Sequence, residues 1–269
     1  MATLQSIDFP PIESALDDPN GLLAVGGDLS VDRLLAAYQR GIFPWFEADQ
    51  PILWWSPDPR AVIAPSGVHV SRSLLKNMRR NHYRLSVNSA FEQVIKACAR
   101  ARDDSEGTWI TEEMMDAYRQ LHDQGHAHSI EVWCNHELVG GLYGVAVGDL
   151  FCGESMFHQK TDASKMAFVA LCKWLAIRKY RLIDCQILNP HLESLGVKTI
   201  SRKVFKSYLT NIAPSSLEDA NSSPTTSCAP PNQSAELDRN GPKWADAATC
   251  RQSDDNHTDC GPICQHPVV

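Results

Sequence analysis

The chain has 269 residues, 43% hydrophobic and 21% charged, and its formal net charge is −7, the balance of a soluble globular protein with one large or two small domains. No stretch approaches the ~18 to 20 apolar residues of a membrane span, and the first residues lack the basic and apolar regions of a signal peptide. The nine cysteines are an odd number without framework spacing, which is typical of a reducing compartment. We therefore expect a cytoplasmic protein that does not contact membranes.

Residues 1–64 are predicted to form a small N-terminal domain, because Pro and Gly residues divide this segment into short turns. A helix is predicted at 30–40, with Ser30 as its N-cap and with inward-facing apolar residues at Leu34, Leu35 and Tyr38. An aromatic cluster follows this helix, and a strand is predicted at 60–64. The aromatic residues are Phe43, Trp45, Phe46, Trp54 and Trp55.

Residues 65–212 show the alternation of a mixed α/β domain, a curved sheet with helices packed on it. Helices are predicted at 71–81, 90–102, 111–124, 161–178 and 201–211, and strands at 84–88, 128–134, 137–147, 149–152 and 181–187. Residues 134–137 are predicted to form a hairpin turn. Because a helix separates strands 149–152 and 181–187, we expect these two to be parallel neighbours.

The helix that begins at Ser71 has one basic face and one apolar face. Its basic residues are Arg72, Lys76, Arg79 and Arg80, its apolar residues are Leu74, Leu75 and Met78, and Arg84 follows it. At 100° per residue the basic side chains lie within about 100° of one another. Such a face is either solvated or in contact with the phosphate backbone of RNA.

Three histidines, His122, His126 and His128, lie close together where a helix gives way to a strand. Their side chains need not converge across this change of structure, and no carboxylate or thiolate completes a ligand set. We therefore favour structural histidines over a metal site.

The strand around residues 181–187 carries polar side chains where a buried parallel strand would be apolar. Asp184 and Gln186 share one face in period two, and Glu154 follows the neighbouring strand. Ligands of open α/β sheets bind at the carboxyl ends of strands. These residues therefore predict an active site or binding cleft, the alternative being a polar pair satisfied by a neighbouring loop.

The chain contains no P-loop, no dinucleotide fingerprint and no nucleophile elbow. We therefore expect no cofactor, no ATP and no acyl-enzyme.

The last segment, residues 213–269, is predicted to be a disordered acidic tail that is dispensable. It has three basic and eight acidic residues, and Trp244 is its single aromatic residue. Its Cys and His residues do not have the spacing of a zinc module. They are Cys250, His257, Cys260, Cys264 and His266.

Segments from about Phe9 to Leu209 together resemble the bacterial leucyl/phenylalanyl-tRNA–protein transferases. The matching segments are 20–29, 38–46, 53–60, 106–110, 125–133, 150–157 and 182–186, with sequences such as Tyr38-Gln-Arg-Gly-Ile-Phe-Pro-Trp-Phe46 and Leu182-Ile-Asp-Cys-Gln186. Each segment alone is weak, but all of them in order and without large gaps are highly specific. The tail lies outside the resemblance.

The resemblance implies a two-domain fold whose larger domain is a GNAT-type N-acyltransferase, without a cofactor. It implies transfer of Leu or Phe, and less readily Met, from the 3′ end of aminoacyl-tRNA to a protein that begins with Arg or Lys. This transfer marks the acceptor for degradation by the N-end rule pathway. A monomer is expected. We find no CoA pyrophosphate loop in the sequence, which favours an RNA-borne donor.

The resemblance also gives roles to single residues. It makes the amide of Gln186 the catalytic centre, polarised by Asp184, and Glu154 is expected to hold the positive N-terminus or basic side chain of the acceptor. The terminal adenosine is expected to stack on Trp45 and Trp109. The aminoacyl side chain is expected to enter a pocket that includes Leu142, Phe151 and Phe168.

Two of the pocket residues depart from the family pattern, which has Met and Leu where this chain has Leu142 and Phe168. A Phe at position 168 is expected to make the pocket shallower and to favour Leu over Phe. Two alternatives remain: a CoA-dependent N-acyltransferase on the same fold, and a non-catalytic RNA-binding module that uses the basic helix and the tryptophans.

Overall fold

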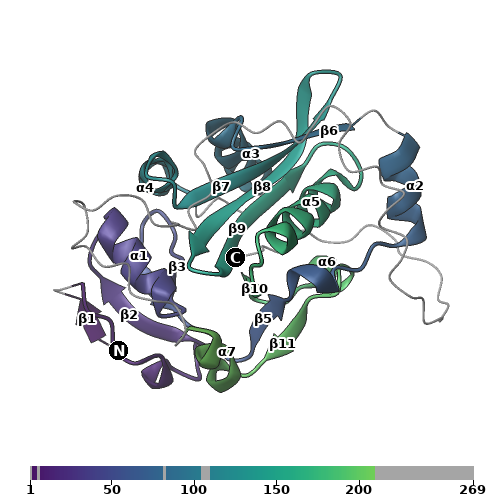
Figure 1. The fold of residues 1–269 in the computed structure, drawn as a ribbon. Coiled ribbons are helices and arrows are strands. Elements are labelled where there is room, and N and C mark those ends of the chain that lie inside the picture. Colours follow the sequence, from purple (N-terminus) through teal and green to yellow (C-terminus); the bar gives the residue numbers. More distant parts are fainter. Residues whose placement is uncertain (1, 5–6, 81–82, 104–109, 210–269) are drawn as a thin grey trace, which may run out of the picture.

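The computed structural model describes residues 2–4, 7–80, 83–103 and 110–209, which form two β-sheets with helices packed against them (Figure 1). The smaller sheet has four strands in the order β1-β2-β4-β3, and the larger has seven in the order β11-β5-β10-β9-β8-β7-β6. The predicted α/β class, with a small N-terminal unit before the main unit, is confirmed.

The smaller sheet lies in the N-terminal unit and is built from very short strands. They are β1 (Ala2–Leu4), β2 (Leu22–Gly26), β3 (Phe43–Pro44) and β4 (Leu53–Trp55), and a 3-10 turn, η1 (Ile12–Ser14), lies among them. None of these elements was predicted, because they lie among the Pro and Gly residues that indicated turns.

Helix α1 (Val31–Gln39) covers this sheet and confirms the helix predicted at 30–40. Leu34 and Tyr38 are buried, and Leu35 is half-buried. Ser30 occupies the N-cap position, but its side chain makes no capping hydrogen bond. Instead its backbone N–H donates to Asp28 Oδ1 at 3.0 Å, so the side chain two residues earlier anchors this end of the helix.

The larger sheet is antiparallel except for one pair, β9 and β10, which run parallel as predicted. Its strands are β5 (Arg60–Ile63), β6 (Tyr83–Val87), β7 (Ala127–Cys134), β8 (Glu137–Val147), β9 (Leu150–His158), β10 (Leu182–Gln186) and β11 (Lys198–Ile200). The predicted turn between β7 and β8 is confirmed. Asn135 and His136 there have φ values of 51° and 66°, as a two-residue hairpin turn requires.

Two parts of the larger sheet differ from the prediction. Strand β9 continues to His158, whereas the sequence predicts an end at 152, because the polar residues Gly153, Glu154 and Ser155 interrupt its apolar pattern. Strand β11 was not predicted, because it has only three residues, of which Lys198 and Thr199 are exposed.

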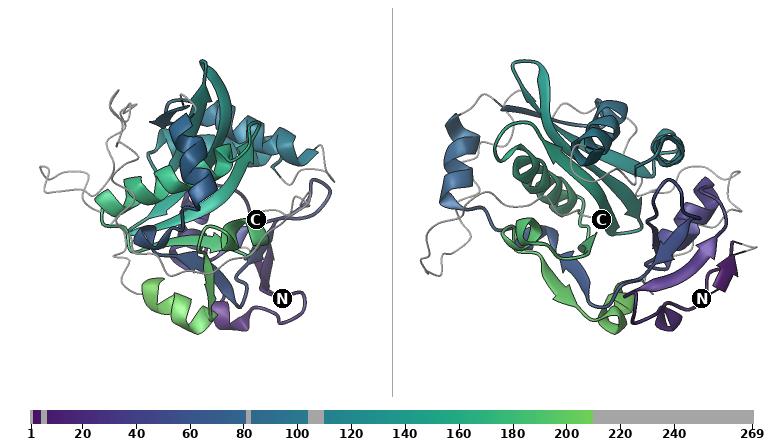
Figure 2. Two further views of the ribbon diagram at one scale, coloured as in Figure 1. Left: turned by 90° about the vertical axis from the view of Figure 1, so that its right-hand side faces the viewer. Right: turned by 180° about the vertical axis from the view of Figure 1, so that it is seen from behind.

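Helices cover both faces of the larger sheet (Figures 1 and 2). Helix α5 lies on one face, and α3 and α4 lie on the other. The remaining helices are α2, which packs against α5, the short α6 that was not predicted, and α7 near the N-terminal unit. The bounds are α2 (Arg72–Arg80), α3 (Phe91–Asp103), α4 (Glu112–Asp123), α5 (Ala163–Ile177), α6 (Pro190–Glu193), α7 (Arg202–Leu209) and the 3-10 turn η2 (Pro65–Gly67).

The two faces of the larger sheet bury two apolar cores. One core joins α3, α4 and the N-terminal unit and includes Leu34, Tyr38 and Tyr118. The other lies under α5 and includes Leu142, Phe151 and Phe168. The N-terminal unit and the main unit therefore share a core, and α1 contacts both α4 and β8.

Strand β5 pairs with β10 on one side and with β11 on the other, so the first 64 residues contribute a strand to the larger sheet. The smaller sheet ends at Trp55, and the border between the sheets lies within residues 56–59. The expected domain limits at 64 and 212 stay predictions, and the tail 213–269 lies outside the described residues. Within the described ranges, every helix is too short or too polar to cross a membrane.

Candidate active site

The candidate site lies at the carboxyl end of β10 and beside the middle of its parallel neighbour β9, where Glu154 lies. The pairing of β10 with β5 shifts its register between Asp184 and Gln186, and Gln186 has a φ of +62°. A left-handed backbone costs a non-glycine residue roughly 1–2 kcal/mol. This bulge interrupts the simple alternation that predicted one polar face, and such strain is typical of functional positions.

Asp184 is held by a buried arginine from the neighbouring strand. Arg60 on β5 donates to both of its carboxylate oxygens, from Nε to Oδ1 at 2.8 Å and from Nη2 to Oδ2 at 2.7 Å. Both side chains are 1% exposed. Such a two-pronged, charge-assisted contact fixes the orientation of the carboxylate.

Two aromatic rings enclose the arginine. The guanidinium carbon lies 4.8 Å from the ring centre of Phe43 and 4.7 Å from that of Phe205. These rings come from β3 and α7, so the N-terminal unit and the last helix both contact the ion pair. Cation–π contacts of this kind offset part of the cost of burying the charge.

Asp184 and Glu154 contact different parts of Gln186. Asp184 Oδ1 accepts a hydrogen bond from the Gln186 backbone N–H at 3.0 Å. Glu154 Oε1 accepts one from the side-chain Nε2 at 3.0 Å. The structure thus brings the three predicted polar residues together, with Glu154 rather than Asp184 on the side-chain amide.

The Glu154 carboxyl is buried, with 1% of the residue exposed, and both of its oxygens have partners. Tyr118 on α4 donates its hydroxyl to Oε2 at 2.7 Å, and Tyr38 on α1 is hydrogen-bonded to the Tyr118 hydroxyl. Burial raises the pKa of Glu154 to about 8, although the hydrogen bonds from Tyr118, Tyr38 and Gln186 favour the charged form. This carboxyl therefore changes charge near neutral pH.

The Gln186 side chain keeps one acceptor for a ligand. Its Nε2 donates to Glu154, and its Oε1 is buried without a hydrogen-bond partner in the part of the chain that the structure describes. A buried carbonyl oxygen without a partner costs about 1–3 kcal/mol. An N–H group that enters the site can satisfy it.

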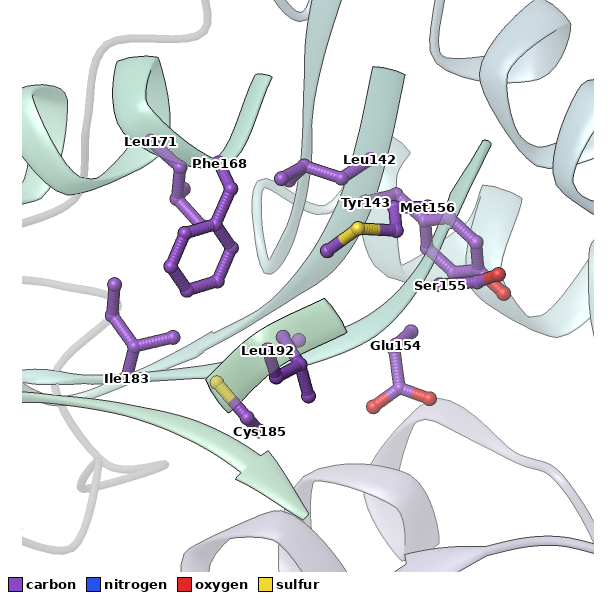
Figure 3. A pocket seen from close by; sticks show the side chains of 11 residues that line it. Leu142, Tyr143, Glu154, Ser155, Met156, Phe168, Leu171, Ile183, Cys185 and Leu192 are labelled. Atoms are coloured by element: carbon purple, nitrogen blue, oxygen red, sulfur yellow. The ribbon is translucent and has the colours of Figure 1, made fainter. Parts of the chain in front are cut away.

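An apolar pocket adjoins these polar groups (Figure 3). Leu142 and Phe168 line it together with Ile183 and Cys185 from β10, and Glu154 lies at its edge. The cavity volume is about 10 Å³, which is room for one water molecule. An aminoacyl side chain therefore enters only if the lining side chains move.

Phe151, the third residue expected in the pocket, is fully buried in the same core but does not line this cavity. Leu142 and Phe168 are at the cavity wall.

Of the two tryptophans expected to stack on adenosine, Trp45 is half-buried and Trp109 lies outside the described residues. The Trp45 ring is 5.6 Å from that of Trp55, at an angle of 54°. Trp55 Nε1 donates to the Trp45 backbone oxygen at 2.7 Å, which fixes this part of the loop. Adenosine binding by both residues stays a prediction.

The two-sided helix is confirmed as α2. Leu74 and Met78 are buried, whereas Arg72, Lys76 and Arg79 are exposed. The Ser71 hydroxyl accepts a hydrogen bond from the Leu74 backbone N–H at 3.2 Å and caps the helix. The side chain of Arg80 lies outside the described residues.

Beyond the helix, Arg84 on β6 is exposed, with its guanidinium 5.3 Å from the Trp133 ring centre.

The three neighbouring histidines do not converge. His122 stacks on Phe91, with ring centres 4.2 Å apart, and its Nδ1 lies 2.8 Å from the Ala127 backbone oxygen. His128 is buried, and burial lowers its pKa to about 4. Over the described ranges, no three His, Cys, Asp or Glu side chains are placed to hold a metal ion.

Sequence reasoning missed three residues of the site: Arg60, Tyr38 and Tyr118. Their contacts join residues separated by 124, 80 and 36 positions, which no local pattern reveals. For Arg60 the sequence contains one indication of a special role, because it is the single charged residue at the start of an otherwise apolar strand. For the two tyrosines the sequence contains no such indication, since each lies on the apolar face of its helix like a core residue.

Known proteins of one family match this chain over most of the described residues. The family described as leucyl/phenylalanyl-tRNA protein transferase matches residues 62–210, and the N-terminal domain of the same family matches residues 27–58. Two proteins named leucyl/phenylalanyl-tRNA–protein transferase are close relatives. The one from Shewanella baltica strain OS195 is 56% identical over 212 residues, 79% of this chain and 90% of its own length. The one from Idiomarina loihiensis is 58% identical over 200 residues, 74% of this chain and 85% of its own length.

Among solved structures, L-PGS from Bacillus licheniformis shares a distant likeness, with a TM-score of 0.37 and 11% identity. The likeness covers 61% of this chain and 55% of that protein, and it is too low to carry an argument.

Proposed function

Because the chain belongs to the leucyl/phenylalanyl-tRNA–protein transferase family, we propose that it moves Leu or Phe, and less readily Met, from aminoacyl-tRNA to the α-amine of an N-terminal Arg or Lys. The product is then marked for N-end rule degradation. One observation supports a reaction at this site above the others. The unpartnered Gln186 Oε1 lies at the carboxyl end of β10, and Glu154, which holds the Gln186 amide, is among the residues that line an apolar pocket.

The reaction needs positioning more than activation. The ester of aminoacyl-tRNA is already activated, so the enzyme must place the amine against the ester carbonyl and stabilise the tetrahedral oxyanion. An α-amine has a pKa of ~8, so a useful fraction is neutral at pH 7 to 8 without a strong base.

Gln186 orients the attacking amine. Its Oε1 accepts a hydrogen bond from the amine N–H, while its Nε2 is held by Glu154. The new C–N bond forms and the bond between the carbonyl carbon and the 3′-oxygen breaks. The amine proton passes to the departing 3′-oxygen through the adjacent ribose hydroxyl or a water, because a primary amide is a poor base.

Asp184 and Glu154 support Gln186 from two sides. The ion pair between Arg60 and Asp184 holds the backbone N–H of Gln186 and so stabilises the bulge. Glu154 has partners on both oxygens and is buried, which supports a role in orienting the amide over the expected contact with the acceptor.

The tRNA donor contacts two surfaces in this proposal. The exposed basic face of α2, with Arg72, Lys76 and Arg79, contacts phosphates, to which Arg80 and Arg84 add charge. Trp45 and Trp109 stack on the terminal adenosine, which is worth ~1 to 3 kcal/mol and tolerates many tRNA sequences.

The deciding experiment combines purified protein with Phe-tRNA or Leu-tRNA and a peptide that begins with Arg. Its acetylated twin, which lacks a free α-amine, is the control. Transfer to the free amine alone, without added ATP or CoA, is the expected result. Transfer from acetyl-CoA instead would favour a CoA-dependent acyltransferase on this fold, and tRNA binding without transfer would favour an RNA-binding module.

A further inference from the structure

We propose that Tyr118, assisted by Tyr38, is a positioning residue that holds the Gln186 amide in its reactive orientation through Glu154. This inference rests on the proposed function, in which Gln186 Oε1 accepts the attacking amine. Neither tyrosine contacts Gln186 directly, so each acts through the Glu154 carboxyl.

The four side chains form one buried line of hydrogen bonds that crosses the molecule. It runs from Tyr38 on α1 to Tyr118 on α4, then to Glu154 on β9 and Gln186 on β10. All four residues are at most 1% exposed. The line therefore joins the N-terminal unit to the reactive amide without passing through solvent.

The donors in this line follow from its ends. Gln186 Nε2 can only donate, so it occupies Glu154 Oε1. The Tyr118 hydroxyl donates to Oε2, so Tyr38 donates to the Tyr118 oxygen. A flipped Gln186 amide would bring its oxygen against Glu154 Oε1, two acceptors facing each other. Glu154, fixed by Tyr118, thus selects one amide orientation.

The same line keeps that orientation when Glu154 takes up a proton. Since Oε1 faces the Gln186 N–H, the proton resides on Oε2. Tyr118 then accepts from Glu154 and donates to Tyr38, so the two hydroxyls reverse and the amide does not turn.

The described groups that face Glu154 determine the pH at which its carboxyl gains or loses a proton. Tyr38 from α1, Tyr118 from α4, and Gln186 and Asp184 from β10 all act on it, and Cys152 lies on its own strand. Arg60 from β5 offsets the charge of Asp184. Of the two tyrosines, Tyr118 makes the 2.7 Å hydrogen bond to the carboxyl, and Tyr38 also favours its charged form.

The test replaces each hydroxyl separately. Tyr118→Phe keeps the ring contact with Tyr143, 5.4 Å between centres, and removes only the hydroxyl. One lost hydrogen bond of about 1–1.5 kcal/mol corresponds to a kcat roughly tenfold lower, with KM for aminoacyl-tRNA within about twofold. Tyr38→Phe is expected to lower kcat by a smaller factor. The double variant should lower kcat at least as far as Tyr118→Phe, because Tyr38 acts both through the Tyr118 hydroxyl and on the Glu154 carboxyl itself. Tyr208→Phe, on α7, is the matched control.

A second readout does not depend on activity. The infrared carbonyl band of the protonated Glu154 carboxyl is identified by its loss in Glu154→Gln. In Tyr118→Phe the pH at which this band disappears should rise, since a hydrogen bond that favours the charged form is gone. In Tyr208→Phe the pH at which the band disappears should equal that of the wild type.

The outcomes separate the two proposals. No transfer by the wild-type protein would overturn the proposed function. Wild-type transfer with kcat of Tyr118→Phe within twofold of wild type, or an unmoved carboxyl band, overturns the positioning role alone. If Tyr118→Phe does not fold, Tyr38→Phe decides: a wild-type kcat and band there also overturn it.

Discussion

Gln186 carries the features expected of a reactive residue rather than a structural one. Its backbone is left-handed at the end of a strand, and its amide is buried with one oxygen unpartnered. Two neighbours hold it directly, Asp184 at the backbone and Glu154 at the side chain, and Arg60 in turn holds Asp184. The sequence predicts the three polar residues from their positions at strand ends, but Arg60 and the tyrosines are set by contacts between distant segments.

Gln186→Glu separates a hydrogen-bonding role from a general-base role. A carboxylate at this position cannot donate to Glu154 Oε1, and the two acids would repel each other. We expect kcat to fall at least about tenfold, as measured by initial transfer rates to the Arg peptide. Gln120→Glu, which places the same charge on the exposed face of α4, is the control. A full rate for Gln186→Glu would favour a true base.

Glu154 is expected to make stability depend on pH. Its pKa in the folded protein is raised to about 8 from 4.5, so its stabilising contribution is complete below pH 4.5 and is lost as pH rises through 8. Relative to Glu154→Gln, the free energy of unfolding should decrease between pH 5 and 8 by at most about 1.4 kcal/mol per pH unit.

Urea unfolding of both proteins at each pH measures this difference. The buried His128 and His191, whose pKa values are lowered to about 4, titrate in both proteins and cancel in the comparison. A difference that stays constant from pH 5 to 8 would contradict the assignment.

Phe168 at the pocket wall is expected to favour Leu over Phe. The cavity is small, and a shorter side chain needs less displacement of the lining residues to enter. Apolar pockets discriminate such pairs by only ~1 to 3 kcal/mol, so both donors should react. Competition between Leu-tRNA and Phe-tRNA measures the preference, and Phe168→Leu should move it toward Phe. A clear excess of Phe transfer by the wild type would refute the expectation.

The long helices and most strands of the larger sheet follow the prediction, including the short β5, β6 and β10, whereas the strands of the smaller sheet and β11 were not predicted. Helices α2 to α5 and the hairpin of β7 and β8 are confirmed. Helices α2 to α4 each have one apolar face, whereas α5 and the two hairpin strands are apolar over most of their length. Strands β1 to β4 and β11 are shorter and gain their order from pairing with distant segments. Strand β9 was predicted too short because its polar centre belongs to the site.

Helix α2 is the element on which tRNA binding can be tested. Arg79→Glu reverses an exposed charge without touching the buried side of the helix, which holds Leu74 and Met78. We expect kcat/KM for aminoacyl-tRNA to fall and its slope against log salt to decrease by about 1. Transfer from aminoacyl-adenosine, which lacks the tRNA body, should not change.

Lys203→Glu, an exposed charge reversal on α7, is the matched variant away from α2. An equal effect of both reversals would show a general effect of net charge and would contradict a tRNA contact at α2.

At the scale of the whole molecule, the site forms where two units meet. Tyr38 and Phe43 come from the N-terminal unit, Phe205 comes from the last helix, and the reactive strand lies between them. The sequence predicts two units from turns and composition. It could not show that they share a core, because that depends on which faces of α1 and α4 meet.

The acidic tail is expected to be dispensable. A chain that ends at Ile212 retains every described element, since α7 ends at Leu209. Its transfer rate and its melting temperature should equal those of the full chain, as measured side by side. A loss of either would show that residues 213–269 contribute to the folded protein.

The position of strand β5 limits where two homologous proteins can be joined in a chimaera. It precedes residue 64, yet its two neighbours are β10, which carries Asp184, and β11. A chimaera joined at residue 64 would graft one parent's β5, with Arg60, into the sheet of the other. A junction within residues 56–59 keeps that strand with its own sheet. Even there, the rings that flank Arg60 would come from different parents, so recombinants of this enzyme must match at Phe43 as well as along the sheet.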